Sequence, residues 1–158
     1  MISSRETVYS SVFAILQTLA PAHFVTVSRR LDNFANVPPI FQPALYQLQA
    51  MERISPRRGM PPVNQLELEL FIYARTDDPT FAPSQFLNPL LDAVFELFEP
   101  NPAKNTTVTQ QWTNGATLTQ TFGIPGVEHI WVEGEIKIAE GCLENQAIAV
   151  IPVSIKTL

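Results

Sequence analysis

The sequence predicts a single α+β domain, with an antiparallel or mixed β-sheet, two helices packed on one face of that sheet and a projecting β-hairpin. Three observations predict this class. Apolar residues recur at helical spacing in two segments, they alternate with polar residues in several others, and turn-forming residues separate these segments. The 158 residues contain neither an internal repeat nor a second-domain boundary, and a chain of this length buries a core that needs no disulfide or metal.

The first helix is expected over residues 5–19. Ser3 and Glu6 stand at the spacing of a capping box, which satisfies free N–H groups in the first helical turn. Ala20-Pro21 follows the helix and ends it, because proline has no N–H to donate. The apolar face of this helix is formed by Val8, Val12, Ile15, Leu16 and Leu19.

Two strands are expected next. Residues 24–30 have the β-branched alternation of a strand, and Pro38-Pro39 marks a loop beyond it. Residues 43–54 can alternate as a second strand, although their alanine, leucine, glutamine and methionine residues also suit a helix. The strand is the interpretation adopted.

A projecting loop is expected at residues 55–63. Three prolines remove backbone donors in this segment, and Gly59 loosens the backbone, so neither a helix nor a strand should continue through it. The loop carries two adjacent arginines, Arg57 and Arg58. Their guanidinium groups should therefore project from the domain.

The clearest strand in the first half covers residues 66–73. Leucine and isoleucine alternate there with a second face that begins acidic, at Glu67 and Glu69, and ends aromatic, at Phe71 and Tyr73. Such a strand is buried on one face. Its acidic end should lie at a surface.

A second helix is expected to end at Pro100. We expect Asn88 to be its N-cap and Pro89 its first residue, because the missing N–H of proline does no harm at that position. The apolar residues at helical spacing are Leu87, Leu90, Leu91, Val94, Leu97 and Phe98.

The last third predicts a hairpin and two long strands. Asn114-Gly115 is a turn signal inside residues 106–122, a polar, threonine-rich arm that should project from the domain. Residues 130–138 then alternate, with Trp131, Glu133, Glu135 and Lys137 on one face. Residues 147–155 are apolar on both faces, which is typical of a strand inside a sheet.

Composition excludes several classes of function. Ten basic and fifteen acidic residues give a net charge of −5, which argues against a non-specific binder of nucleic acid or of anionic membranes. The chain has one cysteine, a first segment unlike a secretory signal and no apolar stretch of the ~18 residues that span a bilayer. We therefore expect a protein that folds in the cytoplasm and does not bind a membrane.

Candidate chemistry is sparse. His23 and His129 have no partner at metal-ligand spacing, and the sequence contains no nucleophile elbow, phosphate loop or zinc-protease motif. The pairs Glu67/Glu69 and Glu133/Glu135 place carboxylates about 7 Å apart on one strand face, a spacing that suits a divalent cation or acid–base pair. Solvated strand faces give the same pattern. We expect no enzyme activity, no cofactor and no metal.

Charge is distributed unevenly along the chain. Residues 1–75 hold seven basic and five acidic residues, a net charge of +2, whereas residues 76–158 hold three and ten, a net charge of −7. A basic flank that meets an acidic flank on a neighbouring copy is what a head-to-tail ring requires, although internal ion pairs would also account for the polarity. The expected assembly interface comprises Arg29, Arg30, Arg53, Arg57, Arg58, Trp112, Asn114, Trp131, Glu133 and Glu135.

Five segments resemble the tail-terminator (tail completion) and neck proteins of tailed bacteriophages. The likeness covers roughly residues 41–155 and consists of hydrophobic patterns with a few fixed polar positions. It is carried by Gln120-Thr121-Phe122-Gly123, Ile130-Trp131-Val132-Glu133-Gly134-Glu135-Ile136, Gln146-Ala147-Ile148-Ala149-Val150-Ile151-Pro152-Val153, Asn88-Pro89-Leu90-Leu91-Asp92-Ala93 and Phe41-Gln42-Pro43-Ala44-Leu45.

The resemblance implies a structural virion protein that forms a hexameric ring at the head-proximal end of the tail tube. Such a ring stops tube growth, contacts the tube protein and the neck or connector proteins, and leaves a channel for the genomic DNA. Its location would be the virion, at the neck of the tail, after assembly in the host cytoplasm. Two alternatives remain, namely a head-side neck or stopper protein of the same virion and a small-ligand binding domain.

Overall fold

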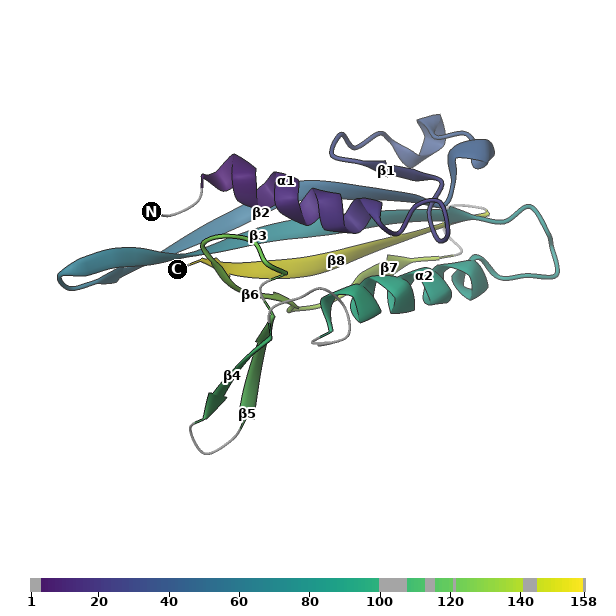
Figure 1. Cartoon of the computed structure of the whole chain (residues 1–158). Coiled ribbons are helices and arrows are strands. Elements are labelled where there is room, and N and C mark those ends of the chain that lie inside the picture. Colours follow the sequence, from purple (N-terminus) through teal and green to yellow (C-terminus); the bar gives the residue numbers. More distant parts are fainter. Residues whose placement is uncertain (1–3, 100–107, 113–115, 121, 141–144, 158) are drawn as a thin grey trace.

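The computed structural model describes residues 4–99, 108–112, 116–120, 122–140 and 145–157, and it confirms the α+β class. A mixed sheet of six strands carries two helices (Figure 1). Two short 3-10 helices, η1 (Phe34–Asn36) and η2 (Pro39–Phe41), precede β2. The main elements are α1 (Arg5–Gln17), β1 (Thr26–Ser28), β2 (Ala44–Arg57), β3 (Met60–Arg75), α2 (Pro83–Phe98), β4 (Val108–Trp112), β5 (Ala116–Gln120), β6 (Val127–Val132), β7 (Lys137–Ala139) and β8 (Gln146–Thr157).

The sheet has the order β1-β2-β3-β8-β6, with β7 also paired to β8. β1 runs parallel to β2 and the other pairs are antiparallel. Buried residues of α1 and α2 join one core with Leu66, Leu68, Leu70 and Ile72 of β3, so both helices pack on the same face. None of the helices in the described part of the chain combines the length and hydropathy that a bilayer crossing requires.

Helix α1 begins at Arg5 as expected, but its N-cap is Ser4 and not Ser3, and it ends at Gln17, two residues before the expected end. The hydroxyl of Ser4 accepts a hydrogen bond from the backbone N–H of Thr7. Val8, Val12 and Leu16 are fully buried against the sheet. The predicted apolar face of the helix is therefore confirmed.

Helix α2 begins before the predicted start. Its first residue is Pro83 and not Pro89, so the expectation of an N-cap at Asn88 is wrong. Glu140, which follows β7, accepts a hydrogen bond from the N–H of Ser84 at 2.9 Å. Its carboxylate thus satisfies one of the free N–H groups in the first turn of α2. Pro89 lies on the exposed side of the helix and removes one backbone hydrogen bond. The helix continues through it because the leucines on the opposite side are buried against the sheet.

The expected loop at residues 55–63 is instead the end of a β-hairpin. β2 continues to Arg57 and β3 begins at Met60, with Gly59 in the left-handed region at φ 72°. Pairing of β3 with β8 starts only at Gln65, so residues 54–64, called the hairpin tip below, form a two-stranded extension beyond the sheet (Figure 1). Prolines are tolerated there because outer strands leave donors unpaired.

The predicted continuous strand over residues 130–138 is broken into β6 and β7. The break faces Pro152 of β8, whose carbonyl accepts a hydrogen bond from the N–H of Glu133. The N–H and C=O groups of one strand residue point to the same side, and proline has no N–H. On the side of β6 and β7, Pro152 therefore offers an acceptor but no donor. Gly134 lies in the break at φ 113°, where a Cβ atom would approach Pro152 Cγ to 3.2 Å.

The hairpin arm expected at residues 106–122 forms the pair β4–β5, with Val108 opposite Gln120 and Trp112 opposite Ala116. The predicted turn at Asn114-Gly115 and the side chain of Trp112 lie outside the described residues. That the arm projects from the domain, and that it contributes to an interface, stay predictions.

Candidate functional site

In the described part of the chain, side chains of the segment before β2 cover one end of the sheet face opposite the helices. There Tyr46 and Tyr73 pack with Val37 and with side chains of the segment before β2, at a ring-centroid distance of 5.3 Å between the two tyrosines. The hydroxyl of Tyr73 donates a hydrogen bond to the carbonyl of Asp32 at 2.7 Å. The aromatic end of the strand predicted at residues 66–73 is therefore buried, while its acidic end stays open.

The open end of this face contains a hollow of about 450 Å3, called the acidic hollow below. Strand pairing brings its walls together, because β3 lies beside β8 and β8 lies beside β6. Trp131 is opposite Ser154, and Ser154 is opposite Glu67. The lining residues are Ala50, Met51, Arg53, Gln65, Glu67, Leu68, Glu69, Trp131, Glu133, Pro152, Val153 and Ser154.

Three carboxylates give the hollow its charge. Glu67 and Glu69 are half-buried on β3, and Glu133 is exposed directly after β6. Glu133 accepts a hydrogen bond from the indole Nε1 of Trp131 at 2.9 Å. Within the described ranges, neither Glu67 nor Glu69 has an ion-pair or hydrogen-bond partner for its side chain. These two carboxylates are available to a cationic group.

An aromatic wall stands beside the carboxylates. The ring of Trp131 stacks on the ring of His129 with a centroid distance of 4.7 Å and an interplanar angle of 15°. Burial lowers the pKa of His129, and Lys156 lowers it further, while Glu128 opposes this shift. The imidazole is therefore neutral near neutral pH and adds no positive charge to this wall.

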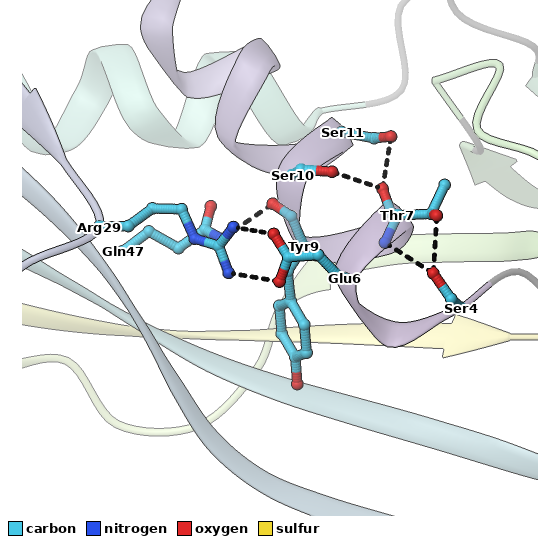
Figure 2. A network of polar contacts seen from close by, with 8 residues as sticks. All are labelled: Ser4, Glu6, Thr7, Tyr9, Ser10, Ser11, Arg29 and Gln47. Carbon is cyan, nitrogen blue, oxygen red and sulfur yellow. Dashed lines mark hydrogen bonds and ion pairs between the residues drawn. The ribbon is translucent and has the colours of Figure 1, made fainter.

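The predicted interface arginines divide into two groups. Arg53 lines the acidic hollow, and Arg57 and Arg58 are exposed on the hairpin tip, where Arg57 Nε donates to the carbonyl of Pro61 at 3.1 Å. Arg29 is instead bound within the protomer to Glu6 of α1 (Figure 2). Arg30 is exposed beside it.

The two predicted carboxylate pairs also differ from each other in the structure. Glu67 and Glu69 share the hollow with Glu133, but Glu135 is exposed and does not line it. Among the residues that the structure describes, no three His, Cys, Asp or Glu side chains are close enough together to hold a metal ion.

Sequence reasoning missed Gln65, Ser154 and Pro152 as members of this site. Gln65 Nε2 donates to Ser154 Oγ at 3.3 Å, although the two residues are 89 positions apart. Only the register of β3 against β8 places them together, and no local pattern in the sequence encodes that register. The alternation of apolar and polar residues along β3 could have identified the open face of the sheet, but it could not have identified which residues of β8 and β6 lie next to it.

No model of a known protein family matches this sequence, and no curated protein matches it at a significant level.

Acid should weaken the attachment of α1 to the sheet. Arg5 binds Glu52 of β2 through two hydrogen bonds of 2.7 and 2.8 Å. Arg29 makes a similar bidentate contact with Glu6 (Figure 2). The hydrogen bonds from the arginines hold the pKa of both carboxyl groups below the ordinary value. Their stabilisation is therefore present above the unfolded pKa of about 4.5 and is lost as the pH falls through the folded pKa.

We expect the variant Glu6→Gln/Glu52→Gln to lose less free energy of unfolding between about pH 5 and pH 3 than the unmodified chain, because it has no carboxylates to protonate at these two sites. Urea unfolding at the two pH values measures this difference. Equal losses in both proteins would show that the ion pairs do not couple pH to stability.

Proposed function

We propose that the protein is a structural assembly protein that associates with copies of itself into a ring at the head-proximal end of a bacteriophage tail. One observation carries the proposal: a single protomer presents two complementary surfaces. The hairpin tip is basic and exposed, and the acidic hollow lies uncovered on the sheet. Surfaces of opposite charge at different places on one chain favour head-to-tail association.

Exposed apolar side chains near the tip support association. Met51, Ile54 and Met60 expose 68%, 57% and 59% of their surface. Exposed large apolar side chains near one another along a hairpin, on a chain of low charge content, favour an interaction surface. Covering them in an interface would contribute about 25 cal/mol for each Å2 of apolar surface removed from water.

The position in the virion is proposed from the resemblance over residues 41–155. Six bodies, each roughly 30 Å across, enclose an opening on the order of 30 Å, which admits a DNA duplex. A channel lined by this acidic chain would let the phosphate backbone pass without holding it, since retention needs lysine and arginine. In this position the ring would stop growth of the tube and contact the neck.

Two experiments test this function. Native mass spectrometry of the purified chain should give a hexamer, and gold labelling of the protein in virions should mark one ring at the junction of tail and capsid. Label along the tube would contradict the terminator role, and label confined to the head side would favour the neck or stopper protein. A chain that is monomeric at every concentration would overturn the assembly function itself.

The hairpin tip can be tested separately. The variant Arg57→Glu/Arg58→Glu should weaken assembly by about 100-fold without changing the fold, because charge reversal at a paired interface replaces attraction by repulsion. The matched control is Arg75→Glu/Lys137→Glu, which makes the same change in net charge at two exposed positions that lie away from the tip and outside the expected assembly interface. An equal loss in the control would show that net charge, and not the tip, governs assembly.

One observation favours a second candidate, a small-ligand binding domain. The acidic hollow combines an indole ring, carboxylates and the polar groups of Gln65 and Ser154, which suits a small cationic ligand. A monomeric chain that binds free arginine or a polyamine in calorimetry would favour this function over assembly.

A further inference from the structure

We propose that the acidic hollow binds the guanidinium groups of Arg57 and Arg58 from a second copy of the chain, so that each protomer receives the hairpin tip of its neighbour. This inference rests on the proposed assembly function. It deepens that function by assigning the surface that the tip contacts.

The chemistry of the hollow suits a guanidinium group. Glu67 and Glu69 project from the same face of β3 and have no partner within the described ranges, so their oxygens can accept hydrogen bonds. A guanidinium group donates two parallel hydrogen bonds to a carboxylate, a geometry that an ammonium group does not match. The indole of Trp131 adds an electron-rich ring at the same place.

The charges of the two surfaces are complementary. Three carboxylates and one guanidinium group, that of Arg53, line the hollow. Residues 54–64 carry Arg57 and Arg58 and no acidic residue. Met51 and Pro152 provide apolar surface in the hollow for Ile54 and Met60, which are exposed on the tip. Charge and apolar surface thus favour the same occupant.

The tip of the same protomer does not reach its own hollow. Gln65 lines the hollow at the base of the tip, and from there the two strands run outward as a paired extension (Figure 1). At ~3.3 Å per residue, Gly59 lies roughly 25 Å along β3 from Glu67. Bending the tip back would break the pairing of β2 with β3. The occupant must therefore come from another molecule.

Contact between a tip and a hollow joins different patches of the two copies, so the contact is heterologous and closes into a ring when its rotation allows. A reciprocal exchange of two tips would give a closed dimer instead. That dimer would support the assignment of the hollow and contradict the proposed ring. The size of the assembly therefore separates the two proposals.

The test reverses the charge of the hollow. The variant Glu67→Lys/Glu69→Lys should weaken self-association by about 100-fold in sedimentation velocity, because two repulsive contacts replace two attractive ones. The matched control is Asp92→Lys/Glu99→Lys, which makes the same change in charge at exposed positions of α2 and the residue after it, away from the hollow. The control should assemble as the unmodified chain does.

Mixing gives the decisive result. The hollow variant keeps a native tip, and Arg57→Glu/Arg58→Glu keeps a native hollow, so the two together should form a 1:1 complex although neither assembles alone. A chain that carries both reversals should regain assembly. If lysine at positions 67 and 69 prevents folding, the isosteric Glu67→Gln/Glu69→Gln should weaken association by about 10-fold with an unchanged circular dichroism spectrum.

The outcomes that overturn the inference are distinct from failure of the proposed function. A folded hollow variant that forms the same ring as the unmodified chain, or a mixture that gives no complex, would exclude the hollow as the receptor while leaving the ring intact. An unmodified chain that never associates would exclude both.

Discussion

Truncating Ile151 to alanine is expected to lower the free energy of unfolding by about 3 kcal/mol. Ile151 lies in β8 opposite Leu70 of β3 and is fully buried in the core that both helices cover. Removing its outer carbons leaves a cavity between the sheet and the helices, because close-packed neighbours relax only in part. For a domain of this size the melting temperature should fall by about 10 °C.

The control for this substitution is Ile138→Ala. Ile138 lies in β7, which also pairs with β8, but 52% of its surface is exposed. We expect a loss below about 1 kcal/mol because little apolar surface returns to water. Urea unfolding of both variants at one low protein concentration gives the comparison. Similar losses would show that Ile151 does not occupy the core.

The second large effect is expected at a buried pair of amides. Gln42 Nε2 donates to Gln146 Oε1 at 3.0 Å, and Gln146 Nε2 donates to Gln42 Oε1 at 2.9 Å. Gln146 also donates to the carbonyl of Ala74, which joins the start of β8 to the end of β3. Replacing Gln146 by leucine would leave Gln42 Oε1 without its donor and would remove the hydrogen bond to the carbonyl of Ala74, whereas Gln42 Nε2 would keep its hydrogen bond to the carbonyl of Val37. The expected cost is about 3 kcal/mol.

A double-mutant cycle tests this interaction. We expect Gln42→Leu/Gln146→Leu to lose less stability than the sum of the two single variants, because each single variant leaves the buried Oε1 of the other glutamine without a donor, whereas the double variant removes both oxygens. Chemical denaturation of the four proteins supplies the coupling free energy. A coupling near zero would contradict the reciprocal pairing.

The sequence predicted the parts of the fold that depend on local periodicity. The alternation of Leu66, Leu68 and Leu70 predicted the buried face of β3, and the spacing of Val8, Val12 and Leu16 predicted that of α1. It failed where tertiary contacts override local chemistry. Helix α2 continues through Pro89 because its buried side packs on the sheet, and β2 and β3 continue through prolines because an outer strand needs fewer donors.

The candidate site was less predictable than the fold. Alternation placed Glu67 with Glu69 and Trp131 with Glu133, but it gave no means of placing these two pairs beside each other. Their meeting depends on β8, which lies between β3 and β6 and is itself apolar. Charge counting also grouped Arg29 with Arg57 and Arg58, whereas Arg29 is bound to Glu6 of the same chain.

The interruption between β6 and β7 has a consequence for solubility. An uninterrupted outer strand offers a row of backbone groups on which a strand of another molecule can add, and growth of such contacts produces fibres. Here that row ends after the six residues of β6 and resumes for only three in β7. Pro152 of β8 therefore leaves this edge of the sheet without a continuous row of backbone groups, and this protects the edge from non-specific addition of strands from other molecules.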